Sequence, residues 1–182
     1  MTTMNDRQPL LDDAVQDACY RQAIAAFGTD IARFVKGYER DRTRRQELLQ
    51  EVHVALWQSF AGFKEQCSMR TWVYRVAHNV GVSHVQRSVR AVGQAGLELQ
   101  EAEFVVDEKA DIEILDRRLD LERLLALIYG LAPLDREVML LYLEDLDAAS
   151  IGEITGLSAR NVATKIHRIK ALLATKLGSR SK

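Results

Sequence analysis

The chain has 182 residues, of which 47% are hydrophobic and 28% charged. This is enough apolar material for one packed domain or two small ones, and too little for a large enzyme architecture. The formal net charge of -1 excludes a strongly basic protein that binds nucleic acid by bulk electrostatics. Only two prolines, Pro9 and Pro133, interrupt a sequence rich in helix formers. We therefore expect an all-α fold.

The near-neutral total charge conceals two segments of opposite sign. Residues 91–120 contain nine acidic and three basic side chains, whereas residues 159–182 contain seven Lys or Arg and no acidic residue. Solvated helices normally mix the two signs, so an unmixed basic segment points towards an anionic partner.

Cys19 and Cys67 stand alone, without the Cys or His spacing of a metal site. We expect no metal and no cofactor. The N-terminus shows neither a basic leader nor a long apolar run, which predicts a cytoplasmic protein with no membrane contact of its own.

Three helical segments are expected in the first half of the chain. Residues 13–38 have helical spacing interrupted near Gly28, so one bent helix or two helices would fit. A second helix is expected over 44–60, with Leu48, Leu49, Val52, Leu56 and Phe60 on one face. After a loop at 64–68, a third helix is expected over 71–90, with Trp72, Val76, Val80 and Val85 as its apolar stripe.

The second half begins with an acidic, Gly-containing stretch of weak periodicity, residues 91–112, which predicts a flexible linker. Helical pattern returns over 114–128 and after Pro133, which suits a helix N-terminus. Two further helices are expected over 148–155 and 159–177.

The last two helices have the arrangement of a helix-turn-helix. Asp147 is a good N-cap for the first helix, Gly156 suits the left-handed residue that ends it, and Ser158 can cap the second helix. In such a motif the second helix enters the major groove of DNA. The alternative is an ordinary helical hairpin with a solvated basic face.

The second expected helix carries Glu47, Gln50 and Glu51 on the face opposite its apolar residues. By itself this is an ordinary polar face. The stretch that follows interleaves aromatic with basic side chains, a mixture that single-stranded nucleic acid requires, although Trp72 and Phe60 fit a core equally well.

Two longer strings carry a family resemblance. RQELLQEVHVALWQSFAGF, followed by SMRTWVYRVAHN, resembles region two of the extracytoplasmic-function sigma factors of bacterial RNA polymerase. LAPLDREVMLLYLEDLDAASIGEITGLSARNVATKIHRIKALL resembles region four of the same family. The resemblance covers roughly residues 25–177 and implies two helical domains, 13–90 and 113–178, joined by the linker 91–112.

The resemblance also implies roles for particular residues. On the polymerase-binding face it places Glu47, Gln50 and Glu51. The promoter element closest to the start site is melted and has a base flipped out. The residues that the resemblance places near this element are Lys64, Ser68, Met69, Arg70, Asn79 and Arg87. On the helix that reads the farther element as duplex it places Arg160, Asn161, Thr164, Lys165 and Arg168. The chain departs from the family pattern at His53, Ser150, Asn161 and Ala163.

The expected function is that of a sigma factor, which binds core RNA polymerase, directs it to promoter DNA and helps to open it. An anti-sigma protein is an expected further partner. One alternative is a stand-alone helix-turn-helix regulator whose N-terminal half dimerises or senses a ligand. The other is an enzyme, but the sequence contains no nucleophile, metal or phosphate-loop pattern.

Overall fold

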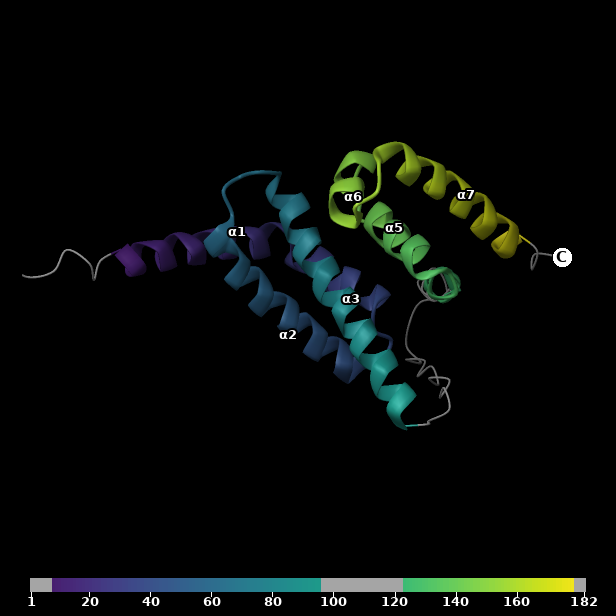
Figure 1. Cartoon of the computed structure of the whole chain (residues 1–182), viewed down its shortest axis with the longest axis horizontal. Helices are drawn as coiled ribbons and strands as arrows, with labels where there is room; N and C mark the ends of the chain where they lie inside the picture. Colours follow the sequence, from purple (N-terminus) through teal and green to yellow (C-terminus); the bar gives the residue numbers. More distant parts are fainter. Residues whose placement is uncertain (1–7, 96–122, 179–182) are drawn as a thin grey trace, which may run out of the picture. The chain divides into compact units, whose positions relative to one another are not determined.

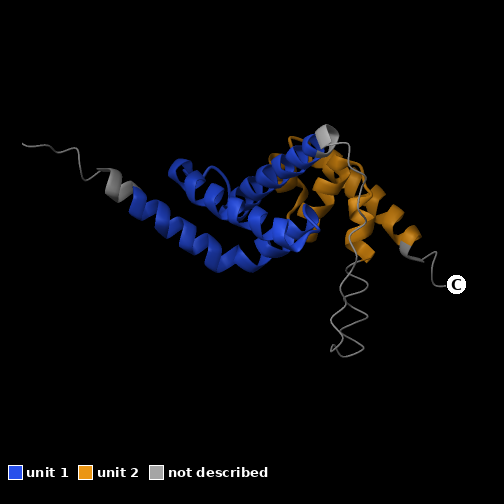
Figure 2. Cartoon of the chain, turned by 90° about the horizontal axis from the view of Figure 1, so that it is seen from below, with its two compact units in different colours: residues 1–97 blue, residues 98–182 orange. Residues whose placement is uncertain are grey.

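The computed structural model describes residues 8–95 and 123–178. Within these ranges all regular structure is helical, and the chain divides into two compact units, Met1–Leu97 and Glu98–Lys182 (Figure 2). The predicted all-α fold of two small domains is confirmed. Most of the predicted linker, and the first part of the helix expected over 114–128, lie outside the described residues.

The N-terminal unit is built from three long helices (Figure 1). Helix α1, Gln8–Phe34, is continuous through Gly28 and is followed by a short 3-10 turn. Helix α2 spans Arg42–Ser59, and helix α3 spans Met69–Ala95, which is longer than predicted. Figure 1 shows α2 and α3 side by side and antiparallel, with α1 crossing them.

Aromatic rings form the centre of this unit. Phe34 makes edge-on contacts with Tyr38 and Tyr74, each at 5.3 Å between ring centroids, a favourable geometry for aromatic pairs. Leu48, Val52, Leu56 and Phe60 of the predicted face of the second helix are buried, while Leu49 is only half-buried.

The predicted apolar stripe of the third helix is wrong. The buried side chains of α3 include Val73, Tyr74 and Ala77. The expected residues, Trp72, Val76, Val80 and Val85, are only half-buried. The prediction failed because the buried side of α3 also carries the polar Thr71 and His78, so its most apolar residues do not mark the face that is buried.

A histidine lies in the N-terminal core. The His78 ring is 5% exposed, and its Nδ1 is hydrogen-bonded to the Tyr38 hydroxyl at 2.9 Å. Burial lowers the pKa of His78 from 6.5 to about 4, so the side chain is neutral at pH 7.

The C-terminal unit is a smaller helical cluster. Residues 123–129 are helical, followed by α5 over Pro133–Leu143, α6 over Ala148–Thr155 and α7 over Ala159–Gly178. Pro133 stands at the beginning of α5, as predicted. Its fully buried side chains include Ile128, Leu141, Ile151 and Ile169.

We predict that Gly81→Ala destabilises the N-terminal unit, although Ala is the better helix former. A Cβ atom at Gly81 would lie 2.8 Å from carbons of the buried Tyr38 ring, and overpacking of this kind costs roughly 1–3 kcal/mol. Urea unfolding monitored by tryptophan fluorescence measures the free energy of unfolding of this unit alone, because both tryptophans, Trp57 and Trp72, belong to it. Gly62→Ala is the control, since nothing lies within 4 Å of a Cβ there. Equal stability of the two variants would contradict the packing argument.

We also predict that acid destabilises the same unit through His78. The unfolded state takes up a proton below pH 6.5, whereas the folded state resists until about pH 4. The full contribution of neutral His78 to the free energy of unfolding is therefore present above pH 6.5. This free energy falls by roughly 3 kcal/mol as the pH decreases to 4. In His78→Gln this part of the pH dependence should disappear, because the amide can still bond Tyr38 but does not titrate. Parallel pH profiles of the two proteins would show that His78 does not contribute.

Candidate functional site

An open groove of about 810 Å³ runs between α2 and α3 of the N-terminal unit. Its polar lining from α2 consists of Glu47, Gln50, Glu51 and Gln58, and from α3 of Asn79, Ser83 and Arg87; Val54, Ala55 and Val80 complete it. Two sets that the sequence assigned to different partners therefore share one groove. The predicted polymerase-binding residues line its α2 side, and Asn79 and Arg87 of the predicted near-element residues line its α3 side.

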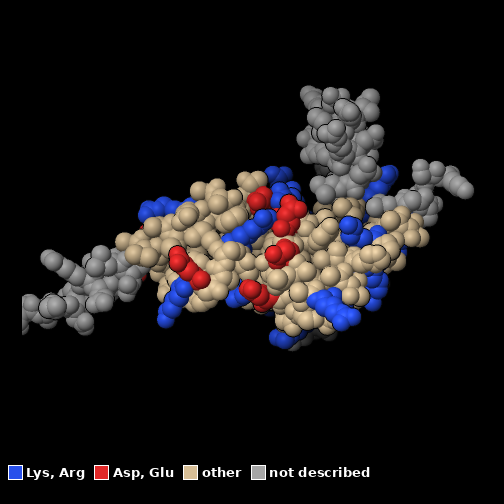
Figure 3. All heavy atoms as spheres, turned by 90° about the horizontal axis from the view of Figure 1, so that it is seen from above, with Lys and Arg blue, Asp and Glu red and all other residues tan. Residues whose placement is uncertain are grey.

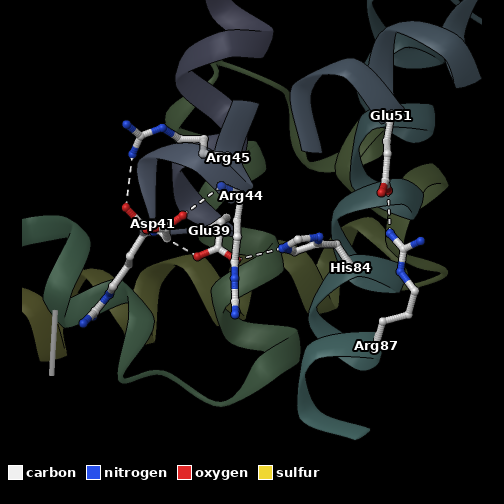
Figure 4. A network of polar contacts seen from close by, with 8 residues as sticks. Glu39, Asp41, Arg44, Arg45, Glu51, His84 and Arg87 are labelled. Atoms are coloured by element: carbon white, nitrogen blue, oxygen red, sulfur yellow. Dashed lines mark hydrogen bonds and ion pairs between the residues drawn. The ribbon is translucent and has the colours of Figure 1, made fainter. Parts of the chain in front are cut away.

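The two sides of this groove are joined by an ion pair. The Arg87 guanidinium donates to the Glu51 carboxylate, as Figure 4 shows. The two side chains are 57% and 43% exposed. Exposed pairs of this kind contribute little free energy, so a charged partner can replace either member. Sequence reasoning missed this pair because spacing within one helix does not show which residues of two helices meet.

The other predicted near-element residues lie at the loop before α3 and at the start of that helix. Ser68 is the N-terminal cap of α3, since its Oγ accepts from the Thr71 amide at 3.0 Å and bonds Thr71 Oγ1 at 2.8 Å. Lys64 is exposed, and Met69 and Arg70 are half-buried. The predicted near-element residues thus form two groups, one at the loop and one in the groove.

Aromatic contacts hold this loop against the helices. The Phe63 ring lies 5.2 Å from that of Trp72 and 5.8 Å from that of Phe60, while Trp72 Nε1 donates to Ser59 Oγ at 3.0 Å. Within the loop, Glu65 adopts a left-handed conformation with φ of 56°. The indole of Trp72 is therefore fixed by packing and by a hydrogen bond, with part of its surface still exposed.

The predicted helix-turn-helix is present in the C-terminal unit. Asp147 accepts from the Ser150 amide at 2.7 Å and caps α6, and Gly156 ends that helix with φ of 77°. Ser158 Oγ accepts from the Asn161 amide at 3.3 Å at the start of α7. One side of α7 is buried through Val162, Ile169 and Leu173, and Ile166 on the same helix is half-buried.

The five predicted duplex-reading residues all lie on α7, in two different settings. Arg160, Asn161 and Thr164 are exposed. Lys165 and Arg168 both reach Asp135 in the first turn of α5, each at 2.6 Å from one of its carboxylate oxygens. On the face drawn in Figure 3, basic side chains are spread over the surface of the C-terminal unit.

Asp135 is a residue that sequence reasoning missed. Burial alone would raise the pKa of its carboxyl, but the hydrogen bonds and positive charges of Lys165 and Arg168 lower that pKa below its usual value. An acid after Pro133 is also what any helix N-terminus favours, so the sequence offered no signal for this contact.

Within the part of the chain that the structure describes, no group of His, Cys, Asp and Glu could hold a metal ion. In the same residues no helix is long and apolar enough to cross a membrane.

Two family models match the chain. The model described as "Sigma-70 region 2" matches residues 23–91, and "Sigma-70, region 4" matches residues 121–173. Together they account for more than half of the sequence and fall on the groove-bearing unit and the helix-turn-helix unit, respectively.

Among curated proteins, the RNA polymerase sigma-H factor of Pseudomonas aeruginosa is 26% identical over 137 residues. The matched region is 74% of this chain and 65% of that relative, so the chain spans slightly less than two thirds of its length.

Two solved structures share the fold. CnrH, in complex with the cytosolic domain of CnrY, has a TM-score of 0.66 at 19% identity, covering 93% of this chain and 99% of that one. The sigma factor RpoE, in complex with the anti-sigma factor NepR from Bartonella quintana, has a TM-score of 0.72 at 14% identity, covering 90% and 98%.

Proposed function

Because the chain belongs to the sigma-70 family, we propose that it is a sigma factor of the extracytoplasmic-function type. In this role it binds core RNA polymerase in the cytoplasm, directs it to specific promoters and assists their opening, without catalytic chemistry of its own. The observation that carries the proposal is the presence of both regions, two and four, each on a separate compact unit.

The α2 side of the groove is the proposed polymerase-binding face. Glu47, Gln50 and Glu51 are exposed there, and Val54, which is 56% exposed, adds apolar surface. Carboxylates and an amide beside an apolar side chain suit a basic helix of the polymerase, because the helix can pair its charges and bury area at once.

The loop before α3 is the proposed contact with the melted promoter strand. Lys64 follows Phe63 in the sequence and Arg70 precedes Trp72 by two residues, so basic residues flank the two rings along the chain, and Ser68 and Met69 complete the loop end. Aromatic rings and cations together bind single-stranded nucleic acid by stacking and phosphate contacts. Asn79 and Arg87, on the same helix as Met69 and Arg70, extend this proposed surface along α3.

Helix α7 is the proposed duplex-reading element. Arg160 and Asn161 are exposed near its N-terminus, the end that contacts base edges in helix-turn-helix proteins. Arginine pairs with guanine and asparagine with adenine, while Thr164, Lys165 and Arg168 suit phosphate or base contacts.

An anti-sigma protein is the remaining proposed partner. One of the two structural relatives was solved bound to an anti-sigma factor, and the other to the cytosolic domain of CnrY. A stand-alone helix-turn-helix regulator is the alternative, and it would bind its operator tightly without polymerase.

We predict that Glu51→Arg abolishes core binding. The substitution places a second cation beside Arg87 and repels a basic partner, without disturbing buried residues. Retention of the full-length chain on immobilised bacterial core RNA polymerase should fall at least tenfold. Asp13→Arg, the same charge reversal at an exposed position of α1, should be retained like the wild type. Circular dichroism spectra should be identical for the three proteins.

The outcomes separate the parts of this proposal. A wild-type chain that does not bind core polymerase, or does not support run-off transcription with it, would contradict the sigma-factor function. Full binding by Glu51→Arg would leave the function standing and move the polymerase face elsewhere.

A further inference from the structure

Asp135 lies between two of the proposed duplex-reading cations. It is held by the first turn of α5, and its side chain is only 15% exposed. Lys165 Nζ contacts one carboxylate oxygen and the Arg168 guanidinium contacts the other, both at 2.6 Å. A single carboxylate therefore bridges two cations one turn apart on α7.

The charges of this cluster do not balance. Because its pKa is lowered, Asp135 is ionised at neutral pH and cancels one of the two positive charges. Lys165 is 25% exposed, whereas Arg168 remains 66% exposed. A DNA phosphate that approaches this side of α7 meets Arg168 at the surface with a carboxylate directly behind it, so it must compete with that carboxylate for both cations.

We propose that Asp135 is a specificity-determining residue that competes with DNA phosphates for Lys165 and Arg168. This inference rests on the proposed duplex-reading role of α7. By weakening sequence-independent phosphate contacts, Asp135 leaves a larger share of the binding free energy to base contacts made by residues such as Arg160 and Asn161.

The test measures how salt affects the binding of the full-length chain to a fluorescein-labelled duplex of mixed sequence, by fluorescence anisotropy. Each phosphate contact adds a slope of about -0.9 to the plot of log affinity against log salt. Asp135→Asn should therefore bind more tightly at low salt and steepen the slope by about one. Between 200 and 50 mM salt its affinity should rise roughly three- to fourfold more than that of the wild type.

Two matched variants distinguish this contact from bulk charge. Asp145→Asn removes the same charge from an exposed position whose φ of 54° asparagine tolerates, and its slope should equal that of the wild type. Asp135→Glu keeps a carboxylate and should preserve the wild-type slope. In a Lys165→Met background, the effect of Asp135→Asn should shrink, because one of the two released cations is gone.

Three results would overturn the inference. The first is an unchanged slope in Asp135→Asn, and the second is an equal change in Asp145→Asn. The third is weaker binding by Asp135→Asn, which would mean that the carboxylate orients the cations for DNA instead of competing with it. If neither the wild type nor any variant binds the duplex even at low salt, the proposed duplex-reading function of α7 is contradicted. The inference about Asp135 is then contradicted as well, because it depends on that function.

Discussion

The burial of Leu48, Val52 and Leu56 in the N-terminal core determines what the rest of that unit can present to a partner. Because these residues occupy one side of α2, Glu47, Gln50 and Glu51 must lie on the other side, at the groove shared with α3. The same packing holds α3 alongside α2 and so brings Asn79 and Arg87 into the groove. A proposed polymerase face and part of a proposed DNA surface are thus consequences of one helix–helix contact. A substitution that shifts α2 against α3 would disturb both surfaces at once.

In both units, charges assigned to external partners are engaged internally. Glu51 pairs with Arg87 in the groove, and Asp135 holds Lys165 and Arg168 beside the helix-turn-helix. The two contacts differ in strength. The groove pair is exposed on both sides, so it is easily exchanged for a partner's charges, whereas Asp135 is largely buried and accepts from two cations. If Glu51 contacts polymerase as proposed, its ion pair with Arg87 must open, so the two proposed surfaces of the groove are coupled through this pair.

Local chemistry made much of this structure predictable. Asp147, Gly156 and Ser158 act within a few residues of their own positions, and the helix-turn-helix that they delimit is confirmed. The apolar face of α2 was predictable because that helix buries a single stripe. The face of α3 was not, because its buried side carries the polar Thr71 and His78 and the small Ala77, which hydrophobicity alone does not mark as core. The contacts of Arg87 with Glu51 and of Asp135 with Lys165 span 36 and 30 residues, and nothing in the periodicity of one helix indicates them.

The near-zero net charge of the chain bears on how strongly it can bind DNA. Non-specific DNA affinity depends on how many phosphates a protein can neutralise, and this chain has a net charge of -1 with two of its proposed duplex-reading cations committed to Asp135. Each unit alone therefore offers few phosphate contacts. In the proposed function, the binding free energy is the sum of contacts made by the proposed polymerase face, the loop before α3 and α7, because each contact raises the effective concentration of the next. In the proposed function, such a chain binds DNA only weakly when alone and becomes selective when polymerase adds its own contacts.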